Sequence, residues 1–478
     1  MSAESRTLSR LPSFLELRNS YKVESYRLYD EVRSCFERTF GVCRGMTFVR
    51  APGRVNIIGE HTDYNGLPVM PMALDREIVI AFTPHERPVV ELVNVDPSYP
   101  PVSFDLSSNI PPYETGHWGN YAKAAAQAVW EWAETHEPDA LPLGGIRGAV
   151  GGSIPSGSGL SSSSALVVAV ACVLSRYLSI TKLELADLLA YGERYVGTQG
   201  GGMDQAVSLL AAKGSALKID FFPLTTRPIK LPENYLFVIG NTMVTANKTG
   251  GARLVYNTRV AECRLGLEML KRSASTKYDL TDATLLKHFL DRVSDWRYYL
   301  DRLPDDPISL ADAADYIGLS EDDLAQKCLI QRDGTLLNPP MEGFCPKKRC
   351  RHVFAEADRV ENAAKASEAG DAETLGALMN ESHSSCALDY EVSCTELDKM
   401  VSIMRRHGAL GARLTGAGFG GCAVALVSAA NAQKLTEGIW YDYYRDYLPT
   451  RGIPIPSDPE SVLFTCSPSE GAGIISYL

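Results

Sequence analysis

The sequence has no run of about eighteen apolar residues of the kind that crosses a membrane, although hydrophobic residues make up 45% of the chain. Its first twenty residues, MSAESRTLSRLPSFLELRNS, are polar where a signal peptide needs an apolar stretch. We therefore expect a cytoplasmic protein with no membrane partner. The last three residues, SYL, only weakly resemble a peroxisomal address, because the basic middle residue is missing.

An excess of positive charge is also missing. The chain has 47 Lys and Arg against 58 Asp and Glu, a formal net charge of -11. The one basic cluster, CPKKRCRH at 345–352, is short. Nucleic-acid binding needs a basic footprint, so we expect no nucleic-acid partner.

The eleven cysteines are scattered singly, and the sequence shows no secretory signal. Free thiols in a reducing compartment are the expected state. Cys345, Cys350 and His352 lie close enough in sequence to suggest zinc, but no second Cys or His pair follows at finger spacing. We therefore expect no zinc site there.

What is present indicates a mixed α+β protein. Stretches rich in β-branched residues and bounded by Gly or Pro predict strands; they lie within 46–91, 145–152, 214–221 and 235–242. Apolar residues at helical spacing predict helices; they lie at 120–137, 181–197, 252–272 and 353–369. A strand, a turn and a strand are predicted over ARLTGAGFGGCAVALV, and a small charged helical insertion over about 273–331.

A loop of glycines and serines runs directly into an apolar segment, GGSIPSGSGLSSSSALVVAVA, at 151–171. Residues 165–174 are apolar all round, which predicts a buried helix. A glycine-rich turn before a helix presents unpaired N–H groups and the positive end of the helix dipole, which suits a phosphate. The alternative is a flexible linker, but linkers are seldom followed at once by a buried helix.

Two common phosphate loops do not fit. A Walker A loop needs a lysine that the serine-rich loop lacks. A G-x-G-x-x-G pattern occurs at Gly416, Gly418 and Gly421, but the strand-like CAVALV follows it where a Rossmann fingerprint needs a helix.

Three motifs resemble those of the GHMP family of small-molecule kinases: APGRVNIIGEHTDYNG at 51–66, PSGSGLSSSSA at 155–165 and LTGAGFGGC at 414–422. The first looks like the signature of the galactokinase branch of that family. With GTQGGGMDQAVSLLA at 197–211, the likeness extends over nearly the whole chain from about residue 45.

The resemblance implies a two-lobed GHMP kinase fold of the α+β class, with mixed sheets and helices and an active site in the inter-lobe cleft. We expect an amino-terminal extension at 1–25, a first lobe at 26–235, and a second lobe at 236–478 that contains the helical insertion. The GAGFGG turn would shape the cleft by close backbone approach.

The activity implied by the resemblance is phosphorylation of D-galactose at C1, with ATP and Mg²⁺, by a monomer. The eukaryotic branch also holds N-acetylgalactosamine kinases, and it holds non-catalytic galactose sensors that have a defective phosphate loop. The intact serines before Ala165 favour an enzyme. Thr62 and Tyr256 take the galactokinase form, where the acetamido-sugar kinases have isoleucine and phenylalanine.

By the same resemblance, the ATP phosphates would bind the loop residues Gly157, Ser158, Gly159, Leu160, Ser161, Ser162 and Ser163. The magnesium ligands would be Ser162 and Glu193, oxygen donors that suit Mg²⁺. Glu193 could instead be a solvated residue on the face of its helix. Adenine would pack against Trp118 and Tyr121, whose alternative is a core role at the start of a helix.

Asp204 would be the catalytic base toward the sugar hydroxyl, in the family role that the resemblance implies. A helix amino terminus and the neighbouring Arg54 would favour its ionised form, so it would be a weak base. Arg54 would bridge Asp204 and the transferring phosphoryl group. Without the motif, Asp204 reads as a helix cap and Arg54 as a solvated surface residue.

The sugar hydroxyls would be bound by Glu60, His61 and Asp63, with Tyr256 and the Gly201 backbone completing the pocket, again by resemblance. Carboxylates suit such a site, because a pocket built to bind a hydroxyl rejects an analogue that lacks it. The alternative for 60–63 is an ordinary surface turn beside YNG.

Overall fold

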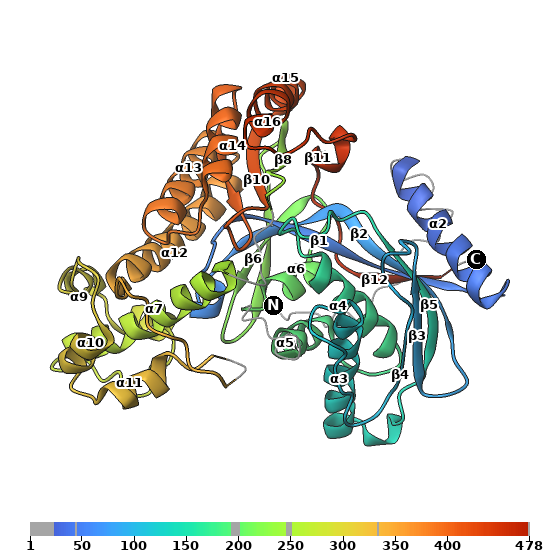
Figure 1. Ribbon diagram of the computed structural model, residues 1–478, viewed down its shortest axis with the longest axis horizontal. Coiled ribbons are helices and arrows are strands. Elements are labelled where there is room, and N and C mark those ends of the chain that lie inside the picture. Colours follow the sequence, from blue (N-terminus) through green and yellow to red (C-terminus); the bar gives the residue numbers. More distant parts are fainter. Residues whose placement is uncertain (1–22, 44, 193–200, 245–250, 332–333, 477–478) are drawn as a thin grey trace.

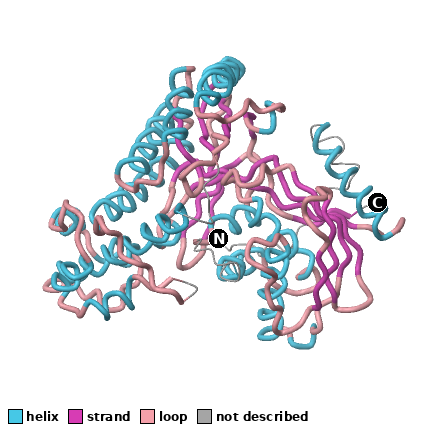
Figure 2. Tube along the Cα trace, viewed as in Figure 1, coloured by secondary structure: helices cyan, strands magenta, loops and turns pink. Residues whose placement is uncertain are grey.

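The computed structural model describes residues 23–476 except 44, 193–200, 245–250 and 332–333. A six-stranded sheet lies on one side of the molecule and a four-stranded sheet on another, each covered by helices (Figure 1). Figure 2 shows the six-stranded sheet at the right, with helices packed below it and above it. Among the described residues, no helix combines the length and the hydropathy that a membrane crossing requires.

The first sheet has the strand order β12-β1-β2-β5-β3-β4, with β3 and β5 parallel and the other neighbours antiparallel. Its strands are β1 (Thr47–Ile58), β2 (Met70–Pro84), β3 (Val89–Asn94), β4 (Val102–Asp105), β5 (Ile146–Gly152) and β12 (Gly473–Ser476). Helix α2 (Val23–Phe40) precedes β1, and α3 (Gly119–His136) lies between β4 and β5 along the chain. Helices α4 (Ser162–Leu174), α5 (Lys182–Gly192) and α6 (Met203–Leu210) follow β5.

Both faces of this sheet are buried. Along β1, Phe48 packs in a cluster with Val32 and Phe36 of α2, and Val49 packs in the main core with α3 to α6. Successive strand residues point to opposite faces, so one apolar strand packs against the helices on both faces of the sheet.

The second sheet is antiparallel in the order β11-β8-β10-β9. Its strands are β8 (Tyr235–Asn241), β9 (Gly411–Thr415), β10 (Cys422–Ser428) and β11 (Leu463–Cys466). Its helices are α12 (Pro346–Glu368), α13 (Ala372–Leu388), α14 (Thr395–Arg406) and α15 (Ala432–Ile439), which continues as a π-helical segment (Trp440–Tyr447) into α16 (Leu448–Thr450). Short 3₁₀ turns lie at Asp63–Asn65, Pro138–Ala140, Ala429–Asn431 and Pro459–Ser461.

The remaining elements are a hairpin between α6 and β8 and a group of helices between β8 and α12. A hairpin of β6 (Ser215–Asp220) and β7 (Thr225–Lys230) ends the first half of the chain. Long helix α7 (Gly251–Ala274) then leads to four short helices, α8 (Leu286–Arg292), α9 (Trp296–Asp301), α10 (Leu310–Ile317) and α11 (Glu321–Cys328). These four occupy the predicted helical insertion, at the lower left of Figure 1.

The predicted buried helix is confirmed as α4, in which every residue from Ser164 to Leu174 is buried. Helix α12 begins seven residues before its predicted start at Val353. Pro346 occupies its first turn, where a missing N–H does no harm, and the basic residues that follow belong to the helix. The prediction began at the apolar pattern and therefore missed this first part.

The division into lobes at residue 235 stays a prediction. The structure adds that the last strand returns to the first sheet: β12 pairs with β1 over four residues, from Thr47 opposite Ser476 to Arg50 opposite Gly473. The carboxyl-terminal segment therefore ties the two halves of the chain together.

Candidate active site

Strand β1 and helix α6 bring together the two residues predicted to carry catalysis. Arg54 Nε lies 2.7 Å from Asp204 Oδ1, and Arg54 Nη2 lies 3.1 Å from Asp204 Oδ2. Arg54 Nη1 also donates to the carbonyl of Gly159 at 2.5 Å. One guanidinium thus ties Asp204 to the glycine-serine loop, with the bidentate geometry that arginine favours.

Asp204 lies in the first turn of α6, after Gly202 at φ 101°. It accepts a further hydrogen bond from the hydroxyl of Ser161. Ser161 itself has a left-handed backbone (φ 63°) and directly precedes α4. Arg54 and Ser161 together fix the carboxylate in front of the amino terminus of α4.

The glycine-serine loop makes the turn that its glycines predicted. Gly157, Gly159 and Ser161 all have positive φ (68°, 78° and 63°). The chain then enters α4 at Ser162, so the first N–H groups of that helix have no partner within the helix. The Ser158 hydroxyl donates to Pro155 O at 2.6 Å, which leaves its backbone N–H as the group it can offer a phosphate.

Other backbone segments approach this loop as closely as glycine allows. A Cβ on Gly416 would lie 2.8 Å from Gly159 O, and one on Gly421 would lie 2.8 Å from Ser158 O. A Cβ on Gly53 would lie 2.7 Å from Leu160 O. The predicted close approach of the GAGFGG turn is therefore present, with the phosphate loop as its neighbour.

Of the two predicted magnesium ligands, the structure describes one. Ser162 is the first residue of α4 and is half-buried, whereas Glu193 lies outside the described residues. The described part of the chain contains no group of three or more His, Cys, Asp or Glu side chains placed for a metal. A hydroxyl at the phosphate loop fits Mg²⁺, which takes one or two protein oxygens and completes its shell with phosphates and waters.

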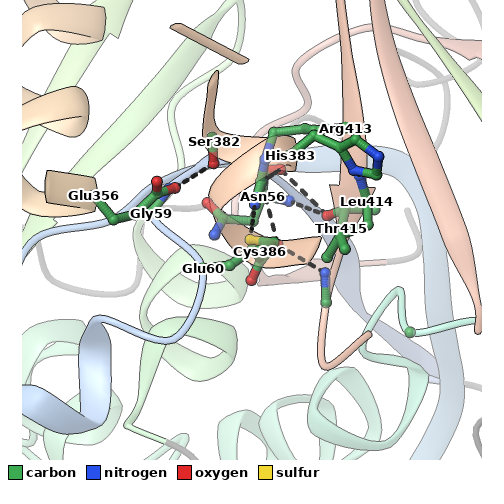
Figure 3. Close-up of polar contacts among 12 residues, drawn as sticks. Asn56, Gly59, Glu60, Glu356, Ser382, His383, Cys386, Arg413, Leu414 and Thr415 are labelled. Carbon is green, nitrogen blue, oxygen red and sulfur yellow. Dashed lines mark hydrogen bonds and ion pairs between the residues drawn. The ribbon is translucent and has the colours of Figure 1, made fainter. Parts of the chain in front are cut away.

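Glu60 is buried and its carboxylate is held by the second sheet (Figure 3). Its Oε1 accepts the Gly416 N–H at 2.8 Å and lies 3.3 Å from Arg413 Nη1. Burial raises the pKa of Glu60, and the Arg413 guanidinium opposes that shift. One of the two oxygens predicted to bind sugar is thus bound to protein.

His61 has a left-handed backbone (φ 62°) and a buried ring. Its Nδ1 lies 2.9 Å from the Tyr64 hydroxyl, and the ring stacks on Tyr390 with centroids 4.7 Å apart. Burial lowers the pKa of His61 to about 3, so the ring is neutral. Its Nε2 is buried with no hydrogen-bond partner among the described residues, and such a buried polar atom points to a missing ligand or water.

Asp63 is in direct contact with Gly201. Asp63 Oδ2 accepts the Gly201 N–H at 3.0 Å, and a Cβ on Gly201 would lie 2.5 Å from Asp63 Cγ. Burial and, to a smaller extent, the nearby carboxylates of Asp204 and Glu60 raise the pKa of Asp63 to about 6. Tyr256 of α7 adds a half-buried ring whose centroid is 5.8 Å from that of His61.

Trp118 is a core residue, the alternative that the sequence left open for it. Its ring is buried in the main core and its indole N–H donates to Pro100 O at 2.8 Å. Tyr121 is half-buried against the same core. Adenine binding at these two residues stays a prediction.

Sequence reasoning missed Arg413, Tyr64 and Tyr390. Arg413 is fully buried in β9, among apolar strand residues, and a lone charge in such a strand was the signal that could have found it. Tyr64 lies inside the quoted signature. Tyr390 lies far along the chain, where no local pattern marks it, yet its hydroxyl is 2.7 Å from that of Tyr64.

Three models of known protein families match the regions of the chain that contain the site. The galactokinase galactose-binding signature matches residues 34–84, the GHMP kinase N-terminal domain matches 120–212, and the GHMP kinase C-terminal domain matches 363–445. The chain is 32% identical to the galactokinase of Dictyostelium discoideum over 98% of both chains. It is 33% identical to the galactokinase of Saccharomyces cerevisiae over 83% of this chain and 85% of that one.

Solved structures agree on the fold. Lactococcus lactis galactokinase complexed with galactose superposes with a TM-score of 0.71 at 28% identity, covering 94% of this chain and 99% of that one. A mevalonate kinase at 18% identity and a TM-score of 0.53, covering 88% of this chain and 98% of that one, shares the fold alone. The family models and the two relatives indicate the same family, and the geometry of the site agrees with it. The chain belongs to the galactokinase family of the GHMP kinases.

Proposed function

We propose that this protein transfers the γ-phosphoryl group of ATP to the C1 hydroxyl of D-galactose, giving galactose 1-phosphate and ADP. The observation that carries the proposal is the Arg54–Asp204 pair: Arg54 belongs to the galactokinase signature and bonds both Asp204 and the Gly159 carbonyl of the phosphate loop. A phosphoryl donor and a sugar acceptor bound on either side of this pair would meet at it. The superposed Lactococcus lactis enzyme was solved with galactose.

The sugar would bind among His61, Asp63 and Tyr256. The neutral His61 ring offers a buried Nε2 that lacks a partner, and Asp63 keeps one carboxylate oxygen beside the Gly201 N–H. Because buried polar groups left unpaired cost about 1–3 kcal/mol, a sugar hydroxyl placed here gains affinity and specificity.

The phosphates would bind at the amino terminus of α4, against the backbone N–H groups of the loop and the serine hydroxyls. Ser162, together with Glu193, would hold the magnesium ion. When bound, Mg²⁺ neutralises charge on the phosphates. No described side chain carries a positive charge in the place of a Walker lysine, so Arg54 and the helix dipole supply the protein's share of that neutralisation.

Asp204 would orient the C1 hydroxyl and accept its proton, and Arg54 would stabilise charge on the transferring group. The three hydrogen bonds to Asp204 fix the position of its carboxylate. That suits phosphoryl transfer, which depends mainly on positioning and electrostatics.

The test is ADP release by the purified protein against a panel of hexoses, with and without Mg²⁺. We expect turnover with galactose that requires Mg²⁺. Binding of galactose and ATP without ADP release would instead identify a non-catalytic sensor, and turnover confined to another sugar would overturn the assignment of galactose.

A further inference from the structure

The dipeptide Gly59–Glu60, at the start of the turn at 59–63 that we propose binds sugar (the sugar-binding turn), is held by two side chains of α12. Glu356 Oε1 accepts the Gly59 N–H at 2.9 Å. His352 Nε2 lies 3.0 Å from the carbonyl oxygen of Glu60. The two residues are one helical turn apart, so a single helix from the second half of the chain grips this peptide at both ends.

His352 can make this contact in one way only. A carbonyl oxygen accepts and cannot donate, so Nε2 carries the hydrogen. Nδ1 of the neutral ring is then an acceptor, 2.9 Å from Ser385 Oγ, whose hydroxyl hydrogen also has Asp389 Oδ2 within reach at 3.1 Å. Burial lowers the pKa of His352 to about 4, which keeps the ring in this neutral form at neutral pH. The ring also packs on Tyr390, with centroids 4.6 Å apart.

Glu356 is equally constrained. Its Oε2 accepts from Arg359 Nε at 2.7 Å, and its Oε1 accepts from the Ser382 hydroxyl as well as from Gly59 (Figure 3). Burial by itself would raise the pKa of Glu356, but Arg359, His352 and Arg413 lower it to about 2. Glu356 is therefore a fixed, ionised acceptor for the Gly59 N–H at the start of the turn.

The residue that follows this peptide is the one that needs such support. His61 has φ 62°, a conformation that costs a non-glycine residue about 1–2 kcal/mol and persists where its surroundings impose it. The contacts to the Gly59–Glu60 peptide fix the chain immediately before His61. The direction of the unpartnered His61 Nε2, and the position of Glu60, depend on that peptide.

We propose that His352 and Glu356 are positioning residues for the sugar: they hold the Gly59–Glu60 peptide and thereby aim His61 and Glu60 at the galactose hydroxyls, without touching substrate themselves. The inference rests on the proposed function. Apart from the Glu356–Arg359 pair within α12 and the ring contact of His352 with Tyr390, these two side chains contact the sugar-binding turn and α13; within the described residues neither hydrogen-bonds to the phosphate loop. Their loss should therefore weaken galactose binding more than ATP binding.

The test compares two pairs of variants. His352→Phe keeps a ring but removes the donor, whereas His352→Gln places an amide N–H near the position of Nε2. Glu356→Met removes the acceptor, whereas Glu356→Gln keeps a carbonyl oxygen. We expect His352→Phe and Glu356→Met to raise the KM for galactose about tenfold or more, because each leaves a buried backbone group unpaired. The KM for ATP should stay within about threefold, and the two Gln variants should recover most of the loss.

Asp358→Ala is the matched control, because Asp358 is an exposed residue of the same helix whose charge partner, Arg297, is also exposed. It should leave both KM values near those of the wild type. The thermal shift on adding galactose gives a second readout: it should shrink in His352→Phe while the shift on adding ATP is kept.

Equal losses for galactose and ATP, an unchanged galactose KM in His352→Phe, or Gln variants as poor as the Phe and Met variants would each overturn the proposal. If neither His352→Phe nor Glu356→Met folds, Ser385→Ala decides. It removes the hydroxyl beside His352 Nδ1, which helps to orient the ring, and should raise the galactose KM alone; no change would count against the proposal. Failure of the wild type to phosphorylate galactose would refute the proposed function instead.

Discussion

Arg54 holds both carboxylate oxygens of Asp204, with Nε 2.7 Å from Oδ1 and Nη2 3.1 Å from Oδ2, although the two residues are 150 positions apart in the sequence. A bidentate pair of this kind fixes the plane of the carboxylate as well as its position. The geometry favours a role in orienting a substrate hydroxyl over the role of an ordinary helix cap.

Asp204→Ala should abolish most turnover while galactose and ATP still bind. Bases that orient and deprotonate a nucleophile contribute ~10²–10⁴-fold in rate. The measurement is kcat, with binding followed separately by calorimetry. Asp371→Ala is the control for the loss of an ordinary helix cap, because the Asp371 side chain accepts the Thr374 N–H at the start of α13. It should lower the free energy of unfolding by about 1 kcal/mol and leave kcat unchanged. Near-normal kcat in Asp204→Ala would refute the assignment.

Ser162→Ala should raise the magnesium concentration needed for half-maximal activity, because one oxygen ligand is lost. The measurement is a Mg²⁺ titration of ADP release at saturating galactose. Ser156→Ala, at an exposed serine earlier in the same loop, should leave the titration unchanged. If Ser162→Ala also leaves it unchanged, the ligand lies elsewhere in the serine run.

Gly416→Ala should impair ATP use. Gly416 has φ 86°, and its added Cβ would lie 2.8 Å from Gly159 O, so the turn must move away from the phosphate loop. Gly408→Ala is matched, because Gly408 has φ 96° with nothing within 4 Å. Both variants should lose about 1–2 kcal/mol of stability from backbone strain. Only Gly416→Ala should lower kcat/KM for ATP, by about tenfold or more; equal kinetics in the two variants would contradict the close approach.

Asp63→Asn should stabilise the unliganded protein at pH 8 while weakening galactose binding. Burial raises the pKa of Asp63 from the ordinary 3.8 to about 6. The folded protein therefore binds the Asp63 proton more tightly than the unfolded chain does. The proton contributes its whole stabilisation below about pH 4, and this contribution is lost as the pH rises through about 6. The difference in Tm between variant and wild type should grow from pH 5 to pH 8. A difference independent of pH would show that Asp63 titrates normally.

Galactose should be used at least about tenfold better than N-acetylgalactosamine, a difference of about 1.4 kcal/mol. Thr62 and Tyr256 are the two positions that differ from the acetamido-sugar kinases, and their surroundings differ. The buried Thr62 hydroxyl donates to Gly59 O and Pro68 O, at 3.0 and 2.8 Å, so it supports the turn. Tyr256 lies against His61 and is the residue that we expect to contact the sugar. The measurement is kcat/KM for both sugars at saturating MgATP; parity, or a preference for the acetamido sugar, would contradict the prediction.

The sequence by itself determined the phosphate loop and its helix. Glycines at 157 and 159 mark left-handed backbone, and the all-apolar run after the serines marks a buried helix, because both properties depend on residues close together in the chain. The motifs around Arg54 and Asp204 marked the pair that we propose is catalytic for a related reason: family signatures are contiguous. The α+β class followed from the same local periodicities.

The tertiary structure alone decided what the sugar-binding turn touches. Glu60 was expected to bind sugar, but one of its oxygens is held by Arg413 and Gly416, more than 350 residues away. His352 was considered only for zinc, yet its ring nitrogens bind Ser385 and the Glu60 carbonyl. Contacts between distant segments depend on how helices and sheets pack, and periodicity within a segment does not encode which partner a buried side chain meets.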